Sequence, residues 1–374
     1  MKIAILGTRG IPNNYGGFEQ CAEFLSVGLV KKGHDVSVYT PNFHSYKETD
    51  YKGVELIRKI NPKKIFGNSI SNFIYDYICL KDAIKKDFDI ILELGLITAS
   101  LSLIFCNHKD KLVVTNVDGI EWKRTKWSKI IVRIIKALEK YGIKHSDYLI
   151  ADNDGIKEYL LKKYNRSSKM ISYGANKVKP PKPDFLKLHG LFQEKYLLTI
   201  ARLEPENNLE MMINAYIKSG IKIPYIIVGN HLTSYGGFLK TKYQSRNVVF
   251  MGGIFNKDIL DNLRYYSKYY LHGHSVGGTN PALLEAMAAK AFILSHKNNF
   301  NESVVENNAF YFTNIDELVS LLQNKSLLDH KKEFITNNLT KIDTIYKWEL
   351  IVNSYELYFQ NILKEPTLKE ISQS

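Results

Sequence analysis

Short apolar stretches alternate with longer amphipathic stretches along the first half of the chain. Short apolar runs bounded by turn residues are typical of buried strands, and the amphipathic stretches between them have the length of helices. This alternation predicts a parallel sheet with helices on both of its faces. The strand candidates of the first half are Lys2–Gly7, Asp35–Thr40, Ile90–Leu94, Lys111–Thr115 and Tyr148–Ala151.

The pattern is interrupted at Lys179-Pro-Pro-Lys-Pro183 and then starts again. A segment so rich in proline forms neither a helix nor a central strand. Since single cores seldom grow beyond roughly 250–300 residues, a chain of 374 residues is long enough for two domains. We expect a first domain at 1–178, a linker at 179–185 and a second open α/β domain at 186–344. The strand candidates of the second half are Tyr196–Ile200, Tyr225–Val228, Val248–Phe250, Tyr269–His272 and Phe292–Ser295.

The last segment, 345–374, contains a predicted helix from about Ile345 to Leu363, followed by a tail. Its aromatic residues are more than a free tail in water would tolerate, so the helix is expected to pack back on the first domain. The predicted fold is therefore α/β, with two Rossmann-like open parallel-sheet domains that face a cleft. Ligands bind at the carboxyl ends of parallel strands, which places the expected site in that cleft.

A glycine-rich loop from His272 to Pro281 leads directly into a predicted helix. Gly277 and Gly278 allow the backbone to turn tightly and to approach a ligand, and Thr279 and Asn280 can cap the helix. The free N–H groups and the positive dipole end of a helix N-terminus favour a phosphate or pyrophosphate group. The loop therefore predicts an anion site.

Glu285 follows about one turn into the same helix. A carboxylate there would repel phosphate but could accept hydrogen bonds from sugar hydroxyls. Together, the loop and the carboxylate predict a nucleotide-sugar pocket. The loop alone is equally compatible with a capped helix that only packs on its sheet.

A second glycine loop, from Gly7 to Glu19, follows the first predicted strand. Its spacing does not match the Gly-x-Gly-x-x-Gly turn of dinucleotide-binding proteins, which disfavours a nicotinamide enzyme. Gly16 and Gly17 precede a predicted helix, so their N–H groups could line the cleft beside a phosphate. The alternative is a flexible surface turn.

The segment from Thr199 to Asn208 places Arg202 just after a predicted strand. A guanidinium group can pair bidentately with diphosphate oxygens and can neutralise charge on a leaving nucleoside diphosphate. Arg202 and Asn208 are therefore candidate donor-binding residues. A surface ion pair is the alternative interpretation for the arginine.

The segment from Asn116 to Trp127 combines acidic, basic and indole side chains. Asp118 and Glu121 could orient or deprotonate a hydroxyl group, and Trp122 and Trp127 could stack on a sugar or lie at a lipid interface. The candidate acceptor-binding set is Asp118, Glu121, Trp122 and Arg124. A capped helix start with core tryptophans is the alternative.

Basic residues from Lys123 to Lys144 interleave with Ile130, Ile131, Ile134, Ile135 and Leu138 on one predicted helix. This helix and the net charge of +13 favour an anionic partner. Such a helix can lie on an anionic membrane, or it can present a solvated face over a core stripe, and the sequence leaves both open. Nucleic acid is disfavoured, because the chain lacks the usual nucleic-acid-binding signatures.

Cys21, Cys79 and Cys106 are scattered, which indicates neither a disulfide framework nor a zinc site. His272 and His274 flank a glycine without a third ligand nearby, so no metal site is expected. No apolar run is long enough for a signal-peptide core or for a membrane span of about 20 residues. We expect a cytoplasmic protein that requires no cofactor, with peripheral contact at the inner face of the cell membrane left open.

With these motifs in this order, the chain resembles the retaining glycosyltransferases of the GT-B class, family 4, over nearly its whole length. The motifs are similar to those of bacterial rhamnosyltransferases of polysaccharide assembly. They are Leu6 to Glu19, Asn116 to Arg124, Ala201 to Asn208 and His272 to Pro281.

The resemblance implies a nucleoside-diphosphate sugar, dTDP-L-rhamnose, in the second domain and a lipid-linked or other saccharide acceptor in the first. Glu285 corresponds to the second glutamate of the family's Glu-x7-Glu pair, and Arg202 to its diphosphate-binding arginine. Two family residues are absent, since the first glutamate falls at Gly277 and a lysine of the arginine loop falls at Asn207. Donor identity is therefore not carried over from typical members.

The implied reaction transfers the sugar with retention of configuration and without a metal. Arg202 and the loop N–H groups would stabilise the departing nucleoside diphosphate, whose phosphate takes the acceptor proton. Asp118 or Glu19 would help to position the acceptor, and domain closure would exclude water. The alternatives are transfer from another UDP-, GDP- or dTDP-hexose, a sugar-nucleotide 2-epimerase, and a non-catalytic membrane- or polyanion-binding scaffold.

Overall fold

The computed structural model of the chain describes residues 1–14, 16–108, 110–117, 119–124 and 127–364. These residues form two compact units. The first contains the described residues of 1–123, 127–173 and 348–364, and the second contains Arg124 and Gly174–Lys347. None of the helices in the described ranges is long and apolar enough to cross a membrane.

The first unit is built on a sheet with the strand order β3-β4-β2-β1-β5-β6-β7-β8. Its neighbouring strands are parallel except for the β3–β4 hairpin. In the central register, Ile5 lies opposite Val38 on one side and Leu92 on the other. The strands are β1 (Lys2–Leu6), β2 (Asp35–Pro41), β3 (Asp50–Tyr51), β4 (Val54–Lys59), β5 (Ile90–Leu94), β6 (Leu112–Val117), β7 (Tyr148–Ala151) and β8 (Lys169–Met170).

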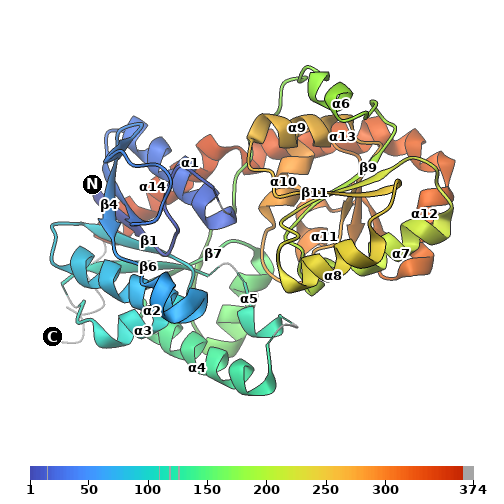
Figure 1. The fold of residues 1–374 in the computed structure, drawn as a ribbon. Coiled ribbons are helices and arrows are strands. Elements are labelled where there is room, and N and C mark those ends of the chain that lie inside the picture. The colour runs from blue at the N-terminus through green and yellow to red at the C-terminus, as the bar shows by residue number, and fades with distance from the viewer. Residues whose placement is uncertain (15, 109, 118, 125–126, 365–374) are drawn as a thin grey trace. The chain divides into compact units, whose positions relative to one another are not determined.

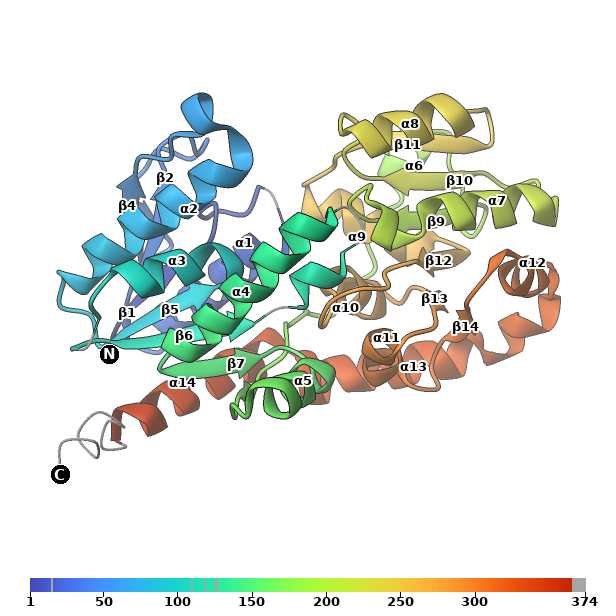
Figure 2. The ribbon, with the colours of Figure 1, turned by 90° about the horizontal axis from the view of Figure 1, so that it is seen from below.

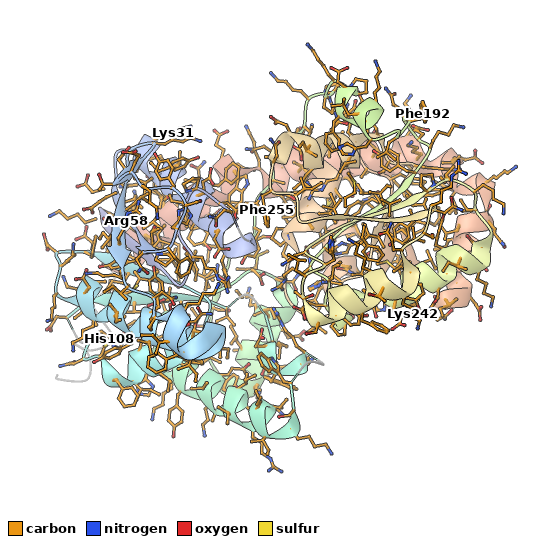
Figure 3. The ribbon with its side chains drawn as sticks, in the orientation of Figure 1. Lys31, Arg58, His108, Phe192, Lys242 and Phe255 are labelled. Carbon is orange, nitrogen blue, oxygen red and sulfur yellow. The ribbon has the colours of Figure 1, made fainter. Side chains whose placement is uncertain are left out.

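Helices cover both faces of this sheet (Figures 1 and 2). On one face, Ala4, Leu6 and Ile91 pack with apolar side chains of α2 and α3 in a buried core. The helices are α1 (Gly17–Lys31), α2 (Lys63–Ile84), α3 (Ile97–Phe105), α4 (Lys129–His145), α5 (Asp154–Tyr164) and α14 (Trp348–Lys364). Long charged side chains such as Lys31, at the end of α1, project outward (Figure 3).

The second unit is built on a sheet of parallel strands with the order β11-β10-β9-β12-β13-β14. Strands β9 and β12 are neighbours, so the loops that follow them leave the same edge of the sheet. The strands are β9 (Leu197–Ile200), β10 (Tyr225–Val228), β11 (Val248–Gly252), β12 (Tyr269–His272), β13 (Ile293–His296) and β14 (Phe310–Phe312).

Helices again lie on both faces of the second sheet (Figure 1). Leu197, Leu271 and Leu294 form a buried core with side chains of α7, α8 and α12. The helices are α6 (Asp184–Leu188), α7 (Leu209–Ser219), α8 (Ser234–Tyr243), α9 (Lys257–Tyr266), α10 (Pro281–Ala288), α11 (Asn299–Val305), α12 (Ile315–Gln323) and α13 (Lys331–Lys341). A π-helical turn, Ile342–Tyr346, follows α13.

The proline segment runs along α9 and is part of the second unit. Asn262 donates a side-chain hydrogen bond to the carbonyl of Lys182, and the Tyr266 hydroxyl donates to the carbonyl of Pro181. The chain passes from the first unit to the second between 173 and 174, and it returns between 347 and 348. The roles assigned to the two predicted domains remain predictions.

The last helix, α14, packs on the first unit, as expected. Trp348 stacks on Phe24 with the ring centroids 4.8 Å apart, and the Tyr355 hydroxyl accepts a 2.7 Å hydrogen bond from the Asn116 side chain. The helix begins at Trp348 rather than at Ile345, because Lys347 has an extended backbone with ψ of 130°.

The predicted α/β fold with two parallel-sheet units is confirmed, and each predicted strand overlaps an observed one. The sequence pattern missed β3, β4, β8 and β14. These strands lie at or next to the edges of their sheets and are short or partly exposed. Such strands lack the continuous apolar run that marks a central parallel strand.

Two carboxyl groups are buried inside the first unit. Glu93 on β5 is 0% exposed, and neither of its carboxyl oxygens has a hydrogen-bond partner in the described ranges. Burial raises the pKa of Asp76 on α2 to about 7. Burial also raises the pKa of Glu93 well above its usual range, and the charge of Asp76 adds to this effect. The pair therefore retains protons that the unfolded chain would release.

We expect the stability of the first unit to fall as the pH rises through this pair. The folded-state pKa values lie above those of the unfolded chain, so the contribution of this pair to stability is fully present below about pH 4 and is lost as the pH rises through the folded-state pKa values, about 7 for Asp76. Glu93→Gln should raise the free energy of unfolding near neutral pH by about 1.4 kcal/mol for each unit by which the pKa of Glu93 is raised, because glutamine has no proton to release on unfolding. Thermal unfolding of Glu93→Gln and of the unchanged protein across this pH range measures the effect. Glu158→Gln, which changes an exposed glutamate, is the control. An unchanged pH dependence in Glu93→Gln would contradict it.

Candidate functional site

The glycine loop of the second unit joins β12 to the N-terminus of α10. The Asn280 side chain caps this helix by accepting a 2.9 Å hydrogen bond from the Ala282 N–H, and Pro281 is the first helical residue. Gly277 has a φ of +131°, a conformation that favours glycine. Gly278 and Thr279 are buried beside it. The loop thus has the capped start and the local geometry that the sequence predicted.

The loop that follows β9 lies directly against the glycine loop. Ser275 donates two hydrogen bonds to the carbonyl of Glu206, from its N–H at 3.0 Å and from its hydroxyl at 2.8 Å. Asn208 donates a 2.8 Å hydrogen bond to the carbonyl of Gly273. A Cβ atom at Gly273 would lie 2.1 Å from the carbonyl oxygen of Asn207. The close packing of the two loops therefore requires glycine at 273.

Arg202 is exposed at the start of the β9 loop. None of the described residues forms an ion pair with its guanidinium group, while its backbone carbonyl accepts hydrogen bonds from Glu204 and Asn207. The backbone is thus held in place and the charged end is accessible. This is the arrangement that an anion-binding arginine requires.

Asn207 stands where the resemblance leads one to expect a lysine, and it is buried. Its amide nitrogen donates to the carbonyl of Arg202 at 2.7 Å, and its amide oxygen lies 2.9 Å from Nδ1 of His274. Asn207 therefore links the two loops from the inside. A lysine at this position has no acceptor group and could not replace the amide oxygen that faces His274.

Glu206 has a buried carboxylate in the same loop, with its side chain 2% exposed. Within the described ranges, neither of its oxygens has a hydrogen-bond partner. Arg124, which is grouped with the second unit, places Nη1 3.8 Å from Oε1 of this carboxylate. Arg124 was predicted to bind the acceptor, and that role stays a prediction.

Glu285 on α10 forms an ion pair with Arg264 on α9. The Arg264 side chain is 1% exposed and that of Glu285 is 16% exposed. A second carboxylate, Asp261, lies 3.4 Å from Nη1 of Arg264. The predicted sugar-binding carboxylate is therefore held by a buried cation, which reduces the repulsion that it would exert on a nearby phosphate.

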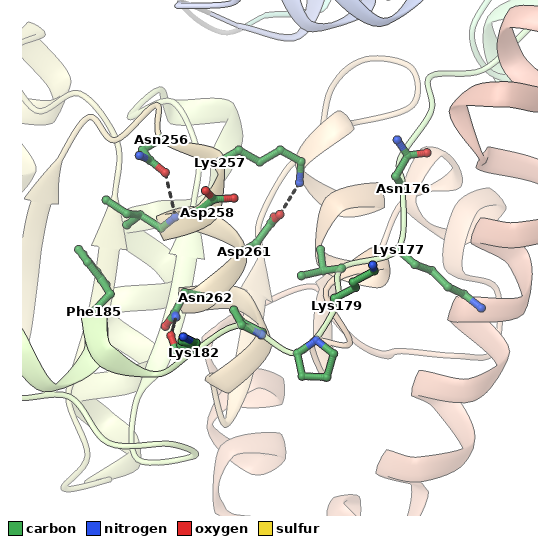
Figure 4. A pocket seen from close by; sticks show the side chains of 14 residues that line it. Asn176, Lys177, Lys179, Lys182, Phe185, Asn256, Lys257, Asp258, Asp261 and Asn262 are labelled. Carbon is green, nitrogen blue, oxygen red and sulfur yellow. Dashed lines mark hydrogen bonds and ion pairs between the residues drawn. The ribbon is translucent and has the colours of Figure 1, made fainter.

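A cavity of about 620 Å³ lies between the proline segment and α9 (Figure 4). Lys257 forms an ion pair with Asp261 at its wall. Through Asp261 and Arg264, a chain of alternating charges runs from this wall to Glu285. Substitutions at the wall are thus expected to act on Glu285 through its ion-pair partner.

In the first unit, Gly16 caps α1 and Gly17 is the first residue of that helix. Glu19 is 4% exposed and accepts a 2.8 Å hydrogen bond from the Arg9 N–H. Burial raises the pKa of Glu19 above its usual range. The structure thus shows Glu19 holding the loop before α1. The donor-binding role of the two glycines and the catalytic role of Glu19 stay predictions.

The other predicted acceptor residues pack against α4 and α5 or against each other. The Trp122 N–H donates a 3.0 Å hydrogen bond to the Tyr159 hydroxyl, and the Lys136 ammonium lies 4.2 Å from the ring centroid of Trp122. The Trp127 N–H donates to Glu121 at 3.1 Å. Asp118 lies outside the described residues. Their contribution to acceptor binding stays a prediction.

His272 and His274 follow each other across the glycine loop, with ring centroids 6.2 Å apart. In the described part of the chain, no group of three or more His, Cys, Asp and Glu side chains is arranged to hold a metal ion. Burial lowers the pKa of His272 to about 3, so this imidazole is neutral.

Comparison with protein families assigns the two halves of the chain separately. Residues 187–337 match the family described as glycosyl transferases group 1. This match lies within the second unit. Residues 1–176 match a domain of unknown function, DUF1972. No curated protein matches the chain.

Solved structures with the same fold extend over nearly the whole chain. A sucrose-phosphate synthase from Thermosynechococcus elongatus is 16% identical, with a TM-score of 0.81 over 96% of this chain and 98% of that one. Anabaena HepE, solved with UDP and glucose, is 16% identical, with a TM-score of 0.74 over 96% and 100%. A glycosyltransferase from Rickettsia africae is 15% identical, with a TM-score of 0.72 over 98% and 99%.

The solved structures confirm the expected GT-B fold. The family match over residues 187–337 supports the expected enzyme class, a glycosyltransferase. The sugar and the acceptor are not identified by them. Within the second unit, the structure brings the predicted Arg202, Asn208 and Gly277 to one edge of the sheet. Sequence reasoning did not identify Arg264. The feature that could have identified it is a cation on the buried face of α9.

We expect Arg264 and Glu285 to act as one unit. Arg264→Met should cost roughly 3–5 kcal/mol of stability, because it leaves Glu285 without its buried partner. Arg264→Met combined with Glu285→Gln should cost less than the two single changes added together. Thermal or denaturant unfolding measures this coupling, and additive effects would contradict it.

Proposed function

We propose that the protein is a retaining glycosyltransferase that moves L-rhamnose from dTDP-L-rhamnose to a saccharide acceptor, of the lipid-linked type, in the synthesis of a cell-surface polysaccharide. One observation carries the nucleotide-sugar part of the proposal. The accessible Arg202 and the capped N-terminus of α10 lie on two loops that are hydrogen-bonded to each other. Together they form a site for a diphosphate.

The chemistry of transfer follows from this arrangement. Negative charge develops on the nucleoside diphosphate as the glycosidic bond breaks, and Arg202 and the N–H groups of the loop before α10 stabilise that charge. The acceptor hydroxyl then attacks the face from which the leaving group departs, and the leaving phosphate takes its proton. This route needs neither a protein nucleophile nor a metal ion.

The proposal of rhamnose rests on the resemblance of the motifs and on Gly277. Gly277 stands where the first glutamate of the family pair would be, and its φ of +131° strains any other residue there. The loop therefore recognises its sugar without that glutamate, which is compatible with a 6-deoxy sugar.

Arg202→Ala is expected to weaken binding of the preferred nucleoside diphosphate about tenfold or more, because a charge-assisted hydrogen bond is lost. The transfer rate should fall about 10²- to 10³-fold. Calorimetric titration with dTDP, UDP, GDP and their sugars measures the first effect, and product formation measures the second. Arg246→Ala, which changes another exposed arginine of the same unit, is the matched control.

The outcomes separate the alternatives. A preference for UDP or GDP would keep the transferase and overturn the rhamnose donor. Interconversion of the donor sugar without an acceptor would show an epimerase instead. If no nucleotide binds, or if Arg202→Ala behaves like Arg246→Ala, the proposed site is wrong.

The lipid-linked acceptor is supported by the outer face of α4, which lies on the outside of the first unit (Figure 2). Ile130 and Ile134 are 70% and 54% exposed, and Ile131 is 38% exposed. The core side of the helix consists instead of residues such as Ile135 and Ile143. A second apolar stripe of α4 is therefore exposed. This argues against the interpretation of the outer face as an ordinary polar surface.

Positive charge flanks this open stripe. The exposed cations of α4 are Lys129, Arg133, Lys136, Lys140 and Lys144, and the acidic residue of the helix, Glu139, is buried. An apolar stripe between cations is the pattern of a helix that lies in the interface of an anionic membrane. We therefore propose that this face of α4 contacts an anionic membrane.

Ile130→Gln combined with Ile134→Gln should reduce binding to vesicles of phosphatidylglycerol and phosphatidylcholine, because the inserted apolar area is lost. Arg133→Gln combined with Lys140→Gln should weaken binding by about 1 kcal/mol per cation and reduce its salt dependence. Cosedimentation measures both, with vesicles of phosphatidylcholine alone for comparison. Ile217→Gln, at an exposed isoleucine of α7, is the control. Binding that is unaffected by either double change would contradict the membrane contact.

A further inference from the structure

We propose that His274 recognises a hydroxyl group of the transferred sugar, and that it accepts the hydrogen bond through Nε2. The inference rests on the proposed function, since it names a residue that would select the sugar of the nucleotide donor. It is carried by the contacts of His274 with Asn207 and Gly277 inside the second unit.

Asn207 determines which nitrogen of His274 carries the hydrogen. The carbonyl of Arg202 can only accept, so the Asn207 group that contacts it at 2.7 Å is the amide nitrogen. The amide oxygen must then face Nδ1 of His274, at 2.9 Å. Because this oxygen can only accept, Nδ1 bears the hydrogen, and Nε2 presents a lone pair.

The surroundings of His274 keep its imidazole neutral. Burial lowers the pKa of His274 well below its usual range, and the neighbouring His272, Arg202 and Arg124 lower it further. A protonated ring would also add a cation to a group of cations. Nε2 is therefore an acceptor throughout the neutral pH range, not a donor.

The position of Nε2 points to the glycine loop. A Cβ atom at Gly277 would lie 3.2 Å from Nε2, so the ring reaches the space where residue 277 has no side chain. His274 is partly exposed, and within the described ranges its ring forms a hydrogen bond through Nδ1. Nε2 thus borders the loop that would hold the diphosphate.

The chemistry of the ligand decides which of its groups can bind there. The diphosphate oxygens of a nucleotide sugar are ionised at neutral pH and have no hydrogen to donate. A hydroxyl of the transferred sugar has one, and that sugar is attached to the outer phosphate. A neutral imidazole beside the phosphate site therefore suits a sugar hydroxyl and not a phosphate oxygen.

The test compares His274→Leu with His274→Gln. Leucine removes the acceptor, whereas glutamine can donate to Asn207 and present its carbonyl oxygen to the ligand. We expect His274→Leu to weaken binding of dTDP-L-rhamnose about 3- to 10-fold and to leave dTDP itself unchanged, as judged by calorimetry. His274→Gln should recover part of the loss. Thermal unfolding of both variants shows that they fold.

Donor analogues that each lack one sugar hydroxyl provide a second measurement. Removal of the hydroxyl that binds Nε2 should weaken binding to the unchanged protein and have no effect in His274→Leu. The inference would be overturned if His274→Leu weakened the binding of dTDP and of dTDP-L-rhamnose equally. It would also be overturned if no analogue showed this coupling with His274→Leu.

Failure of the inference can be told from failure of the proposed function. If the unchanged protein binds and transfers the sugar, and His274→Leu does so equally well, only the role of His274 is wrong. If the unchanged protein binds no nucleotide sugar, both the proposed function and the role of His274 are wrong. If it prefers another nucleotide sugar, the same comparison is made with that donor.

Discussion

The candidate site depends on the close contact between two loops that leave neighbouring strands of the second sheet. Gly273 makes this contact possible, because any side chain there would collide with the carbonyl of Asn207. Ser275 and Asn208 then join the loops by hydrogen bonds to backbone carbonyls. Without this contact, Arg202 and the loop before α10 would be two separate features and not one candidate site.

Charge is distributed around this contact according to burial. Arg202 is exposed, where a cation costs little to maintain and can meet an anion. Arg264 is buried, and it is balanced by Glu285 and Asp261. His274 stays neutral, because burial and the nearby Arg202 and Arg124 disfavour its protonated form. The same domain can therefore present a cation to phosphate and neutral or acidic acceptors to hydroxyls.

The first unit places a different kind of surface on the outside of its sheet. Helix α4 has apolar residues on two faces, and only one of these faces packs against the protein. The remaining face is bordered by cations. Since a stripe of isoleucines has the same sequence pattern whether it faces the core or the outside, periodicity alone could not separate a membrane-binding face from a core stripe.

The sequence by itself determined the parallel α/β fold, the central strands and the helix start at Pro281, because these follow from local patterns of apolar residues, glycine and proline. It also determined that Arg202 and Glu285 are candidate ligand-binding residues. Only the tertiary structure decided that Arg264 holds Glu285, that Asn207 orients His274, and that Ile130 and Ile134 of α4 face outward. Each of these depends on which residues distant in the chain are brought into contact, and no local pattern encodes that partner.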